Sequence, residues 1–304
     1  MRNITRKTLF AVLCGAILLS ALSGCTKSSD SVPSEISVAS VSDASSADPF
    51  PATSCGVKLE KAPEKVVSLS PAATEIICEL GFKDKLVGIS DYCDYPEGLS
   101  AEKVGSTENP DIDAIISLKP DAVFTLSALS EREAYTLNQA NIAVLTAEPP
   151  KNMEGYSALY REIAAAFYGK ETAGSEKDTS KAVQIGADAR SAIEKAAKDV
   201  KLESFVYVTG KLTAAGAETF EGSVLGLSGE NVCKEKGYVA ADMIASVPKY
   251  IIADSSLTEY DLCADETLSG YIYGGAEIKF VNASVFERPS ARTAVVFKEL
   301  APSS

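Results

Sequence analysis

The chain has 304 residues, and its 42 acidic side chains outnumber its 29 basic ones, giving a formal net charge of −13. This charge argues against binding to nucleic acid and against close contact with an anionic lipid surface. The chain contains no histidine, so a Cys–His pair and a Ser–His–Asp triad are excluded, and metal sites that combine histidine with cysteine are disfavoured.

The amino terminus is typical of a secretory signal. Three basic residues precede an apolar stretch from Leu9 to Leu22, which is too short to span a bilayer comfortably and fits a signal h-region. The stretch closes with the letters LSGC, which resemble the bacterial lipobox and end at Cys25. We therefore expect residues 1–24 to be a lipoprotein signal peptide and Cys25 to carry a stable lipid anchor outside the cytoplasm. An ordinary signal peptide is the alternative.

A polar segment separates the signal from the rest of the chain. Residues 26–54 contain ten serines and no long apolar run. Such a composition cannot bury enough apolar surface to offset the entropy of ordering. Residues 25–54 are therefore expected to form a flexible tether that lies outside the fold.

Strands and helices alternate in the segment that follows. Ser70 and Pro71 suit the N-cap and the first position of a helix, and Ser130 with Glu133 forms a capping box before another. Short apolar runs predict buried strands at residues 66–69, 86–89, 122–125 and 142–145. This alternation predicts a parallel sheet that is covered by helices.

Two amphipathic segments, residues 156–168 and 181–201, interrupt the alternation, and the second keeps apolar residues at helical spacing. Alternation then resumes, with strands predicted at 205–208, 250–253 and 278–281 and helices near 224–227 and 292–300. The segments IISLKPDAVF and MIASVPKYII each place a proline between a helix end and a buried strand. We therefore expect an α/β fold with an N-terminal lobe (55–180), a linking helix (181–201) and a similar C-terminal lobe (202–304).

The segment SDYCDYPEG, residues 90–98, concentrates polar and aromatic side chains directly after a predicted strand. Ligands of open α/β sheets bind at the carboxyl ends of strands, and tyrosine offers an apolar face and one hydroxyl to a large, partly polar ring system. The cluster is therefore interpreted as the lip of a pocket. The plainer alternative is a polar turn that Pro96 ends.

Two long segments carry a family resemblance. EKVVSLSPAATEIICELGFKDKLVGISDYCDYPE and the following KVGSTENPDIDAIISLKPDAVF resemble the N-terminal lobe of ABC-transporter substrate-binding proteins of the helical-backbone class. GSVLGLSGENV and VFERPSARTAVVFKELA are similar to segments of the family's second lobe, and DYCDYP and FERPSAR look most like cobalamin-binding members. The resemblance implies two Rossmann-like lobes bridged by one long helix, a ligand cleft between them, and a monomeric receptor that docks on a membrane permease.

The resemblance also assigns candidate ligand-binding residues. Tyr92 matches a family tyrosine that contacts the corrinoid, and Phe286 and Arg288 match positions near the ligand. Arg288 could donate to corrin amides or to a carboxylate, or pair at the surface with Glu287 or Glu299. The full set is Ser70, Pro71, Tyr92, Tyr95, Phe220, Tyr238, Phe286 and Arg288. Core packing is the alternative role of Phe220 and Tyr238.

The sequence departs from the family pattern in two places, one at the ligand cleft and one at the permease-docking surface. Cobalamin-binding members often place tryptophans at the cleft, yet this chain has none and Thr107 stands where one is expected. The family meets the permease with one carboxylate on each lobe. Asp113 matches in the first lobe. In the second lobe an alanine stands at the matching position, so Asp242 and Glu235 are the docking candidates.

The leading hypothesis is a lipid-anchored receptor that delivers cobalamin or a related corrinoid to an ABC importer, without enzymatic activity, metal or cofactor. A ferric-hydroxamate siderophore or haem receptor of the same fold is the alternative, although haem and catecholates would require several Lys or Arg at the cleft. A secreted carboxylate-dependent hydrolase and a surface adhesion or sensor module are the alternatives of another class. A Cys233–Cys263 disulfide is also possible.

Overall fold

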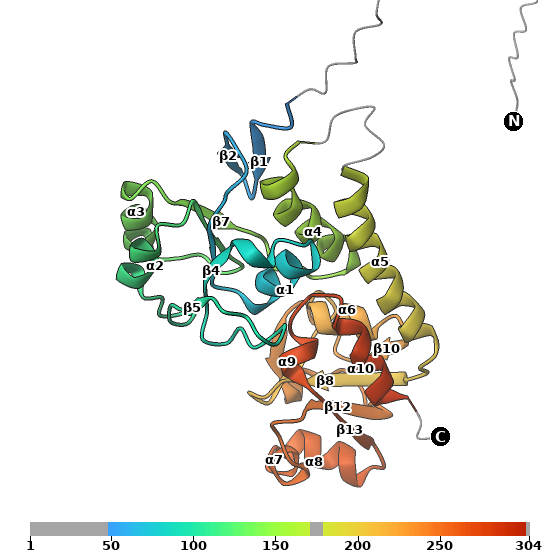
Figure 1. Cartoon of the computed structure of the whole chain (residues 1–304). Coiled ribbons are helices and arrows are strands. Elements are labelled where there is room, and N and C mark those ends of the chain that lie inside the picture. Colours follow the sequence, from blue (N-terminus) through green and yellow to red (C-terminus); the bar gives the residue numbers. More distant parts are fainter. Residues whose placement is uncertain (1–47, 171–178, 302–304) are drawn as a thin grey trace, which may run out of the picture. The chain divides into compact units, whose positions relative to one another are not determined.

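The computed structural model describes residues 48–170 and 179–301, all within one compact unit (Figure 1). The predicted signal peptide, Cys25 and most of the predicted tether lie outside these residues. The last tether residues, Ala52–Ser54, form strand β1, which pairs antiparallel with β2 (Val57–Leu59). Ser54 is buried and its hydroxyl donates to the Glu162 carbonyl of helix α4 (Met153–Tyr168) at 2.7 Å. The predicted tether is therefore too long at this end.

The N-terminal lobe is a parallel five-stranded sheet in the order β5-β4-β3-β6-β7. Its strands are β3 (Val66–Ser68), β4 (Leu86–Ile89), β5 (Glu102–Lys103), β6 (Ala122–Thr125) and β7 (Ala143–Thr146). Its helices are α1 (Pro71–Glu79), η1 (Lys83–Lys85), α2 (Ile112–Leu118) and α3 (Glu131–Gln139). Helices α2 and α3 share an apolar cluster with one face of the sheet, and α1 and α4 share a cluster with the other. The predicted parallel, covered sheet is thus confirmed.

Local sequence signals explain where the first helices begin. The Ser70 side chain accepts a hydrogen bond from the Ala73 amide, and Pro71 occupies the first helical turn. Ser130 and Glu133 form the predicted capping box, with both reciprocal hydrogen bonds present. Each contact satisfies amides that a helix start would otherwise leave unpaired.

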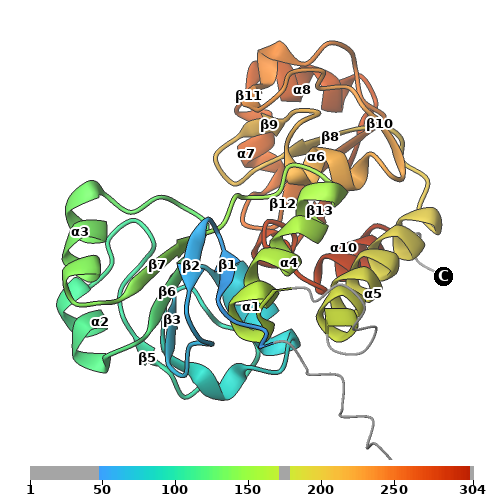
Figure 2. The ribbon, with the colours of Figure 1, turned by 90° about the horizontal axis from the view of Figure 1, so that it is seen from above.

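Helix α5 (Thr179–Lys198) carries the chain into the C-terminal lobe (Figures 1 and 2). It packs against α4. There Gly186 lies so close to Tyr160 that a Cβ atom added to Gly186 would lie 2.9 Å from the Cβ of Tyr160. At its other end, the Ser228 hydroxyl donates to the Ala197 carbonyl at 2.7 Å. The helix begins and ends two or three residues before the predicted range of 181–201.

The C-terminal lobe is a mixed sheet in the order β11-β9-β8-β12-β13, with β10 also paired to β8. Its strands are β8 (Glu203–Val208), β9 (Thr213–Ala215), β10 (Gly229–Asn231), β11 (Tyr238–Ala240), β12 (Tyr250–Asp254) and β13 (Glu277–Val281). Its helices are α6 (Phe220–Leu225), η2 (Ala241–Met243), α7 (Glu259–Cys263), α8 (Glu266–Tyr273), α9 (Ala283–Phe286) and α10 (Thr293–Leu300). Strands β8, β12 and β13 are parallel as predicted, whereas β9 and β11 add an antiparallel edge.

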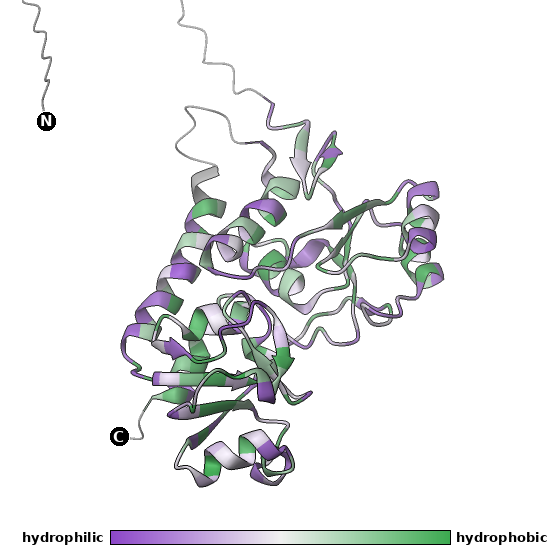
Figure 3. Ribbon diagram, turned by 180° about the vertical axis from the view of Figure 1, so that it is seen from behind, coloured by the Kyte–Doolittle hydropathy of each residue, from purple (hydrophilic) through white to green (hydrophobic). Residues whose placement is uncertain are grey.

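One apolar cluster joins residues of both lobes through α4, α5 and α10. Hydrophobic (green) and hydrophilic (purple) segments alternate along the long helices in Figure 3. All five cysteines within the described ranges are free thiols, so the possible Cys233–Cys263 disulfide is not formed. No helix in residues 48–170 or 179–301 has the length and apolar character needed to cross a bilayer. The same residues contain no group of His, Cys, Asp and Glu that could hold a metal ion.

Candidate functional site

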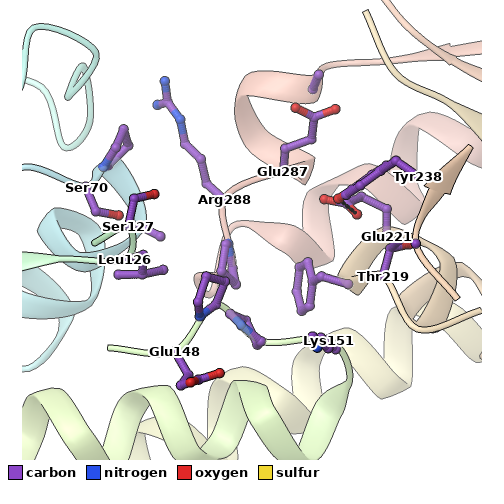
Figure 4. Close-up of a pocket in the computed structure, with 18 of the residues that line it drawn as sticks. Ser70, Leu126, Ser127, Glu148, Lys151, Thr219, Glu221, Tyr238, Glu287 and Arg288 are labelled. Carbon is purple, nitrogen blue, oxygen red and sulfur yellow. Dashed lines mark hydrogen bonds between the residues drawn. The ribbon is translucent and has the colours of Figure 1, made fainter. Parts of the chain in front are cut away.

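A cavity of about 940 Å³ lies between the two lobes (Figure 4). The N-terminal lobe contributes the segments that follow β3, β4, β6 and β7: residues 70–72, 92, 126–127 and 148–151. The C-terminal lobe contributes residues 218–221, 236–238, 283–284 and 287–289. The cavity thus lies where four neighbouring parallel strands end, which is the usual ligand position in open α/β sheets.

Six of the eight candidate ligand-binding residues line this cavity. They are Ser70, Pro71, Tyr92, Phe220, Tyr238 and Arg288. Tyr92 is 59% exposed and lies at the rim, so its ring is available to a ligand. Phe220 lines the cavity and also belongs to the hydrophobic core, because its ring stacks on the buried ring of Tyr156. Their contact with a ligand remains a prediction.

Phe286 and Tyr95 do not line the cavity, so their predicted placement is corrected. Phe286 is fully buried in the C-terminal lobe and packs edge-to-face on Tyr207, with ring centroids 5.1 Å apart. Short helix α9 turns Phe286 toward the core, which leaves its neighbours Glu287 and Arg288 to face the cavity. The Arg292 guanidinium carbon lies 4.1 Å from the centroid of the Tyr95 ring, so Tyr95 contributes to a contact between the lobes.

Thr107 also lies away from the cavity lining. Its hydroxyl donates to the Leu69 carbonyl, at the end of β3. This side chain therefore supports the strand end and does not replace the tryptophan expected from the resemblance.

Two acids, the buried Glu221 and the exposed Glu287, form part of the cavity wall in the C-terminal lobe and were not among the binding candidates taken from the sequence. Glu221 is only 3% exposed, and its Oε2 accepts a hydrogen bond from the Tyr238 hydroxyl at 2.6 Å. The Oε1 of Glu287 accepts from the Tyr207 hydroxyl at 3.0 Å. In the sequence both acids look like ordinary helix-terminal charges, so only the fold reveals that they share one wall (Figure 4).

The pKa of both carboxyl groups is raised. Loss of surrounding water raises the pKa of Glu221, and the hydrogen bond from Tyr238 only partly opposes this effect. The same loss of water raises the pKa of Glu287, and the negative charges of Glu221 and Asp254 raise it further. The wall is therefore an electrostatically costly place for two negative charges.

Backbone pairing explains how Tyr238 reaches Glu221. The amides of residues 216, 217 and 218 donate to the carbonyls of residues 237, 235 and 236, at 2.7–3.0 Å. A Cβ at position 216 would lie 2.1 Å from the Glu235 carbonyl oxygen, so only glycine permits this approach. The pairing brings the start of β11 over α6, and with it the Tyr238 hydroxyl.

Arg288 crosses from one lobe to the other. Its guanidinium forms a hydrogen-bonded ion pair with Asp94 and donates to the Tyr92 carbonyl at 3.0 Å. Partial burial alone would raise the pKa of Asp94, but the hydrogen bond and charge of Arg288 outweigh it and lower that pKa. The surface pairing of Arg288 with Glu287 or Glu299 that the sequence left open is not formed.

A buried carboxylate holds the lobes together beside the cavity. Glu75 of α1 is 1% exposed and accepts hydrogen bonds from the Ser290 hydroxyl at 2.6 Å and from Arg292 Nη1 at 2.9 Å. One helical turn later, Glu79 accepts a hydrogen bond from the Ala291 amide at 3.2 Å. We call Glu75, Glu79, Ser290, Ala291 and Arg292 the interlobe cluster.

The three docking candidates are all exposed. Asp113 lies in the first turn of α2, Asp242 in η2, and Glu235 in the loop before β11. Ala241, at the position that matches the family's second carboxylate, is buried. Contact with a permease remains a prediction for each acid.

Comparisons with known proteins agree with this architecture. The profile of the periplasmic binding protein family matches residues 66–264. The uncharacterized ABC transporter substrate-binding lipoprotein YvrC of Bacillus subtilis is 31% identical over 225 residues, which cover 69% of this chain and 68% of YvrC. The vitamin B12-binding protein of Vibrio cholerae is 37% identical over 100 residues, about a third of each chain (32% and 32%).

Among solved structures, the periplasmic heme-binding protein HutB of Vibrio cholerae superposes with a TM-score of 0.63 at 15% identity. The superposition covers 78% of this chain and 99% of HutB. At this identity the likeness shows the fold alone. It is a fold of two α/β lobes.

Proposed function

Because this chain belongs to the periplasmic binding protein family of ABC transporter substrate-binding proteins, we propose that it captures cobalamin or a related corrinoid and delivers it to an ABC importer. The observation that carries the proposal is the interlobe cavity of about 940 Å³, with Tyr92, Phe220 and Tyr238 along its lining. Flat aromatic faces and single hydroxyls suit a large ring system with polar side chains. The similarity to the vitamin B12-binding protein over about 100 residues supports the same ligand class.

The charges of the cavity favour a corrinoid over haem. Three basic residues line it: Arg288 is paired with Asp94, Lys236 lies 3.2 Å from Glu218, and Lys151 belongs to the N-terminal lobe. Glu221 and Glu287 add negative charge to the wall. A corrinoid with neutral amide side chains fits this charge distribution better than haem, whose negatively charged propionates would meet the acids of this wall.

A cationic ferric-hydroxamate complex is the second candidate, because the acidic wall would attract a positively charged ligand as well. Calorimetric titration of the purified protein with cyanocobalamin, ferrioxamine B and haemin separates the candidates. We expect one molecule of cyanocobalamin to bind each protein. Binding of haemin or ferrioxamine B, with none of cyanocobalamin, would contradict the corrinoid proposal.

We further propose that Asp113 contacts the permease. The substitution Asp113→Arg is expected to impair ligand uptake by cells, because it reverses an exposed charge at the proposed docking surface. Affinity should change by less than about twofold, since well-separated sites act independently. Uptake and affinity are measured side by side, with Asp84→Arg, another exposed acid of the same lobe, as the matched control. A large loss of affinity with normal uptake per bound ligand would show that Asp113 has another role.

The anchor is proposed from the LSGC motif and from the similarity to a lipoprotein of Bacillus subtilis. In cells fed a labelled fatty acid, the wild-type protein is expected to take up the label, and Cys25→Ala is expected to remain unlabelled. Cys55→Ala is the matched control, because Cys55 lies after the tether and near α4. Equal labelling of the Cys25→Ala protein would rule out lipidation at this residue.

A further inference from the structure

We propose that Glu221 and Glu287 make the cavity selective for ligands that present amide or ammonium groups to the C-terminal lobe, and against ligands that present carboxylates there. The inference depends on the proposed function in one respect only, namely that the interlobe cavity holds the ligand. It concerns which chemical groups that cavity accepts.

Both acids retain the capacity to accept further hydrogen bonds. Glu221 receives a hydrogen bond from Tyr238 on Oε2, and no other side chain in the described ranges donates to it. Glu221 lines the cavity, and each oxygen of a carboxylate can accept more than one hydrogen bond. Glu287 receives the Tyr207 hydroxyl on Oε1, which leaves Oε2 for a ligand donor.

No cation in the described part of the chain lies within 4 Å of either carboxylate. Lys211 acts on Glu287 from a greater distance, and burial together with the charge of Glu221 still leaves the pKa of Glu287 raised. Glu221 is buried, and a buried charge without a cationic partner is unfavourable. A ligand N–H group at this wall would therefore relieve a cost that the free protein carries.

Two of the three basic residues that line the cavity are engaged elsewhere, and the third, Lys151, belongs to the N-terminal lobe. Arg288 reaches across to Asp94 and the Tyr92 carbonyl, and Lys236 pairs with Glu218. A ligand carboxylate placed at the wall would thus meet two acids that have no cation within 4 Å among the described residues. Because hydrogen bonds to charged groups are stronger than neutral ones, we expect an amide to be preferred over a carboxylate by about 10- to 150-fold.

The experiment compares matched ligands on the full chain. Cyanocobalamin is titrated against its three propionic monocarboxylic acids, each of which replaces one amide by a carboxylate. Ferrioxamine B, with a free ammonium, is titrated against its N-acetyl derivative. The proteins are the wild type, Glu221→Gln and Glu287→Gln, and the control Glu230→Gln, which removes an exposed acid of the same lobe. Thermal melting of each variant establishes that it is folded.

For the wild type, we expect at least one monocarboxylic acid to bind about 10- to 150-fold more weakly than cyanocobalamin, and either glutamine variant to narrow that gap. Glu230→Gln should leave the gap unchanged. Equal binding of cyanocobalamin and all three acids would overturn the inference and leave the corrinoid proposal intact. If no corrinoid binds, a preference for ferrioxamine B that depends on Glu221 or Glu287 would uphold the inference and refute the corrinoid proposal. Absence of any such preference would refute both.

Discussion

Substitution of Arg292 by methionine is expected to lower the free energy of unfolding by up to about 3–5 kcal/mol, because the buried Glu75 carboxylate loses its partner at 2.9 Å and keeps only the more distant Arg288, at 3.8 Å. For a domain of this size, that loss corresponds to a fall in melting temperature of roughly 6–20 °C. Differential scanning calorimetry or urea denaturation measures it. The hydrogen bonds that Glu75 accepts in this cluster all come from the other lobe, so the loss would show that contacts between the lobes stabilise the protein.

Two further proteins make this result interpretable. Lys249→Met removes an exposed ion pair with Glu203 and should change the melting temperature little, because exposed pairs are screened by water. The double variant Glu75→Gln/Arg292→Met removes the unpaired charge, and part of the lost stability should return. A single variant as stable as the wild type would show that the interlobe cluster does not support the fold.

Truncation of Tyr92 is expected to weaken cyanocobalamin binding by about 5- to 150-fold, because the ligand loses contact with an aromatic ring and with one hydroxyl. Tyr92→Phe should weaken binding far less, since it keeps the ring. Isothermal titration well below the melting temperature measures both.

Tyr95→Ala is the matched control for Tyr92→Ala. Tyr95 belongs to the same loop but lies against Arg292 outside the cavity lining, so its loss should leave affinity nearly unchanged. If Tyr95→Ala abolishes binding and Tyr92→Ala does not, the loop and not the Tyr92 ring is what the ligand requires. If Tyr92→Ala lowers only the melting temperature, the segment is a structural turn.

The fold could be predicted because its signals are local. Apolar runs marked the central strands, and Ser70, Pro71 and the Ser130–Glu133 capping box marked helix starts that the structure contains. The antiparallel edge formed by β9 and β11 was missed, since three-residue strands have no periodicity to detect. The start of α6 was placed too late because the predicted apolar run began at Val224, whereas the Thr219 side chain caps the helix just before Phe220.

Only those site residues could be predicted from the sequence whose position shortly after a strand is enough to place them at the cavity. Ser70 and Tyr92 follow β3 and β4 directly, so their place near the strand ends was foreseeable. Phe286 was misplaced because resemblance gives sequence position, whereas the turn of α9 decides which neighbour faces the cavity. The pairing of Arg288 with Asp94, 194 residues away, depends on tertiary structure alone.

The central claim is that the interlobe cavity holds a corrinoid, and the absence of tryptophan from the chain offers a direct test. A single tryptophan introduced as Ser284→Trp would lie in the cavity lining, and one introduced as Tyr260→Trp would lie at an exposed site of α7 outside that lining. The corrin ring absorbs tryptophan emission, so cyanocobalamin should strongly quench the fluorescence of the Ser284→Trp protein at stoichiometric concentration and that of the Tyr260→Trp protein much less. Equal quenching of the two proteins, or none in the Ser284→Trp protein while calorimetry reports binding, would contradict the account.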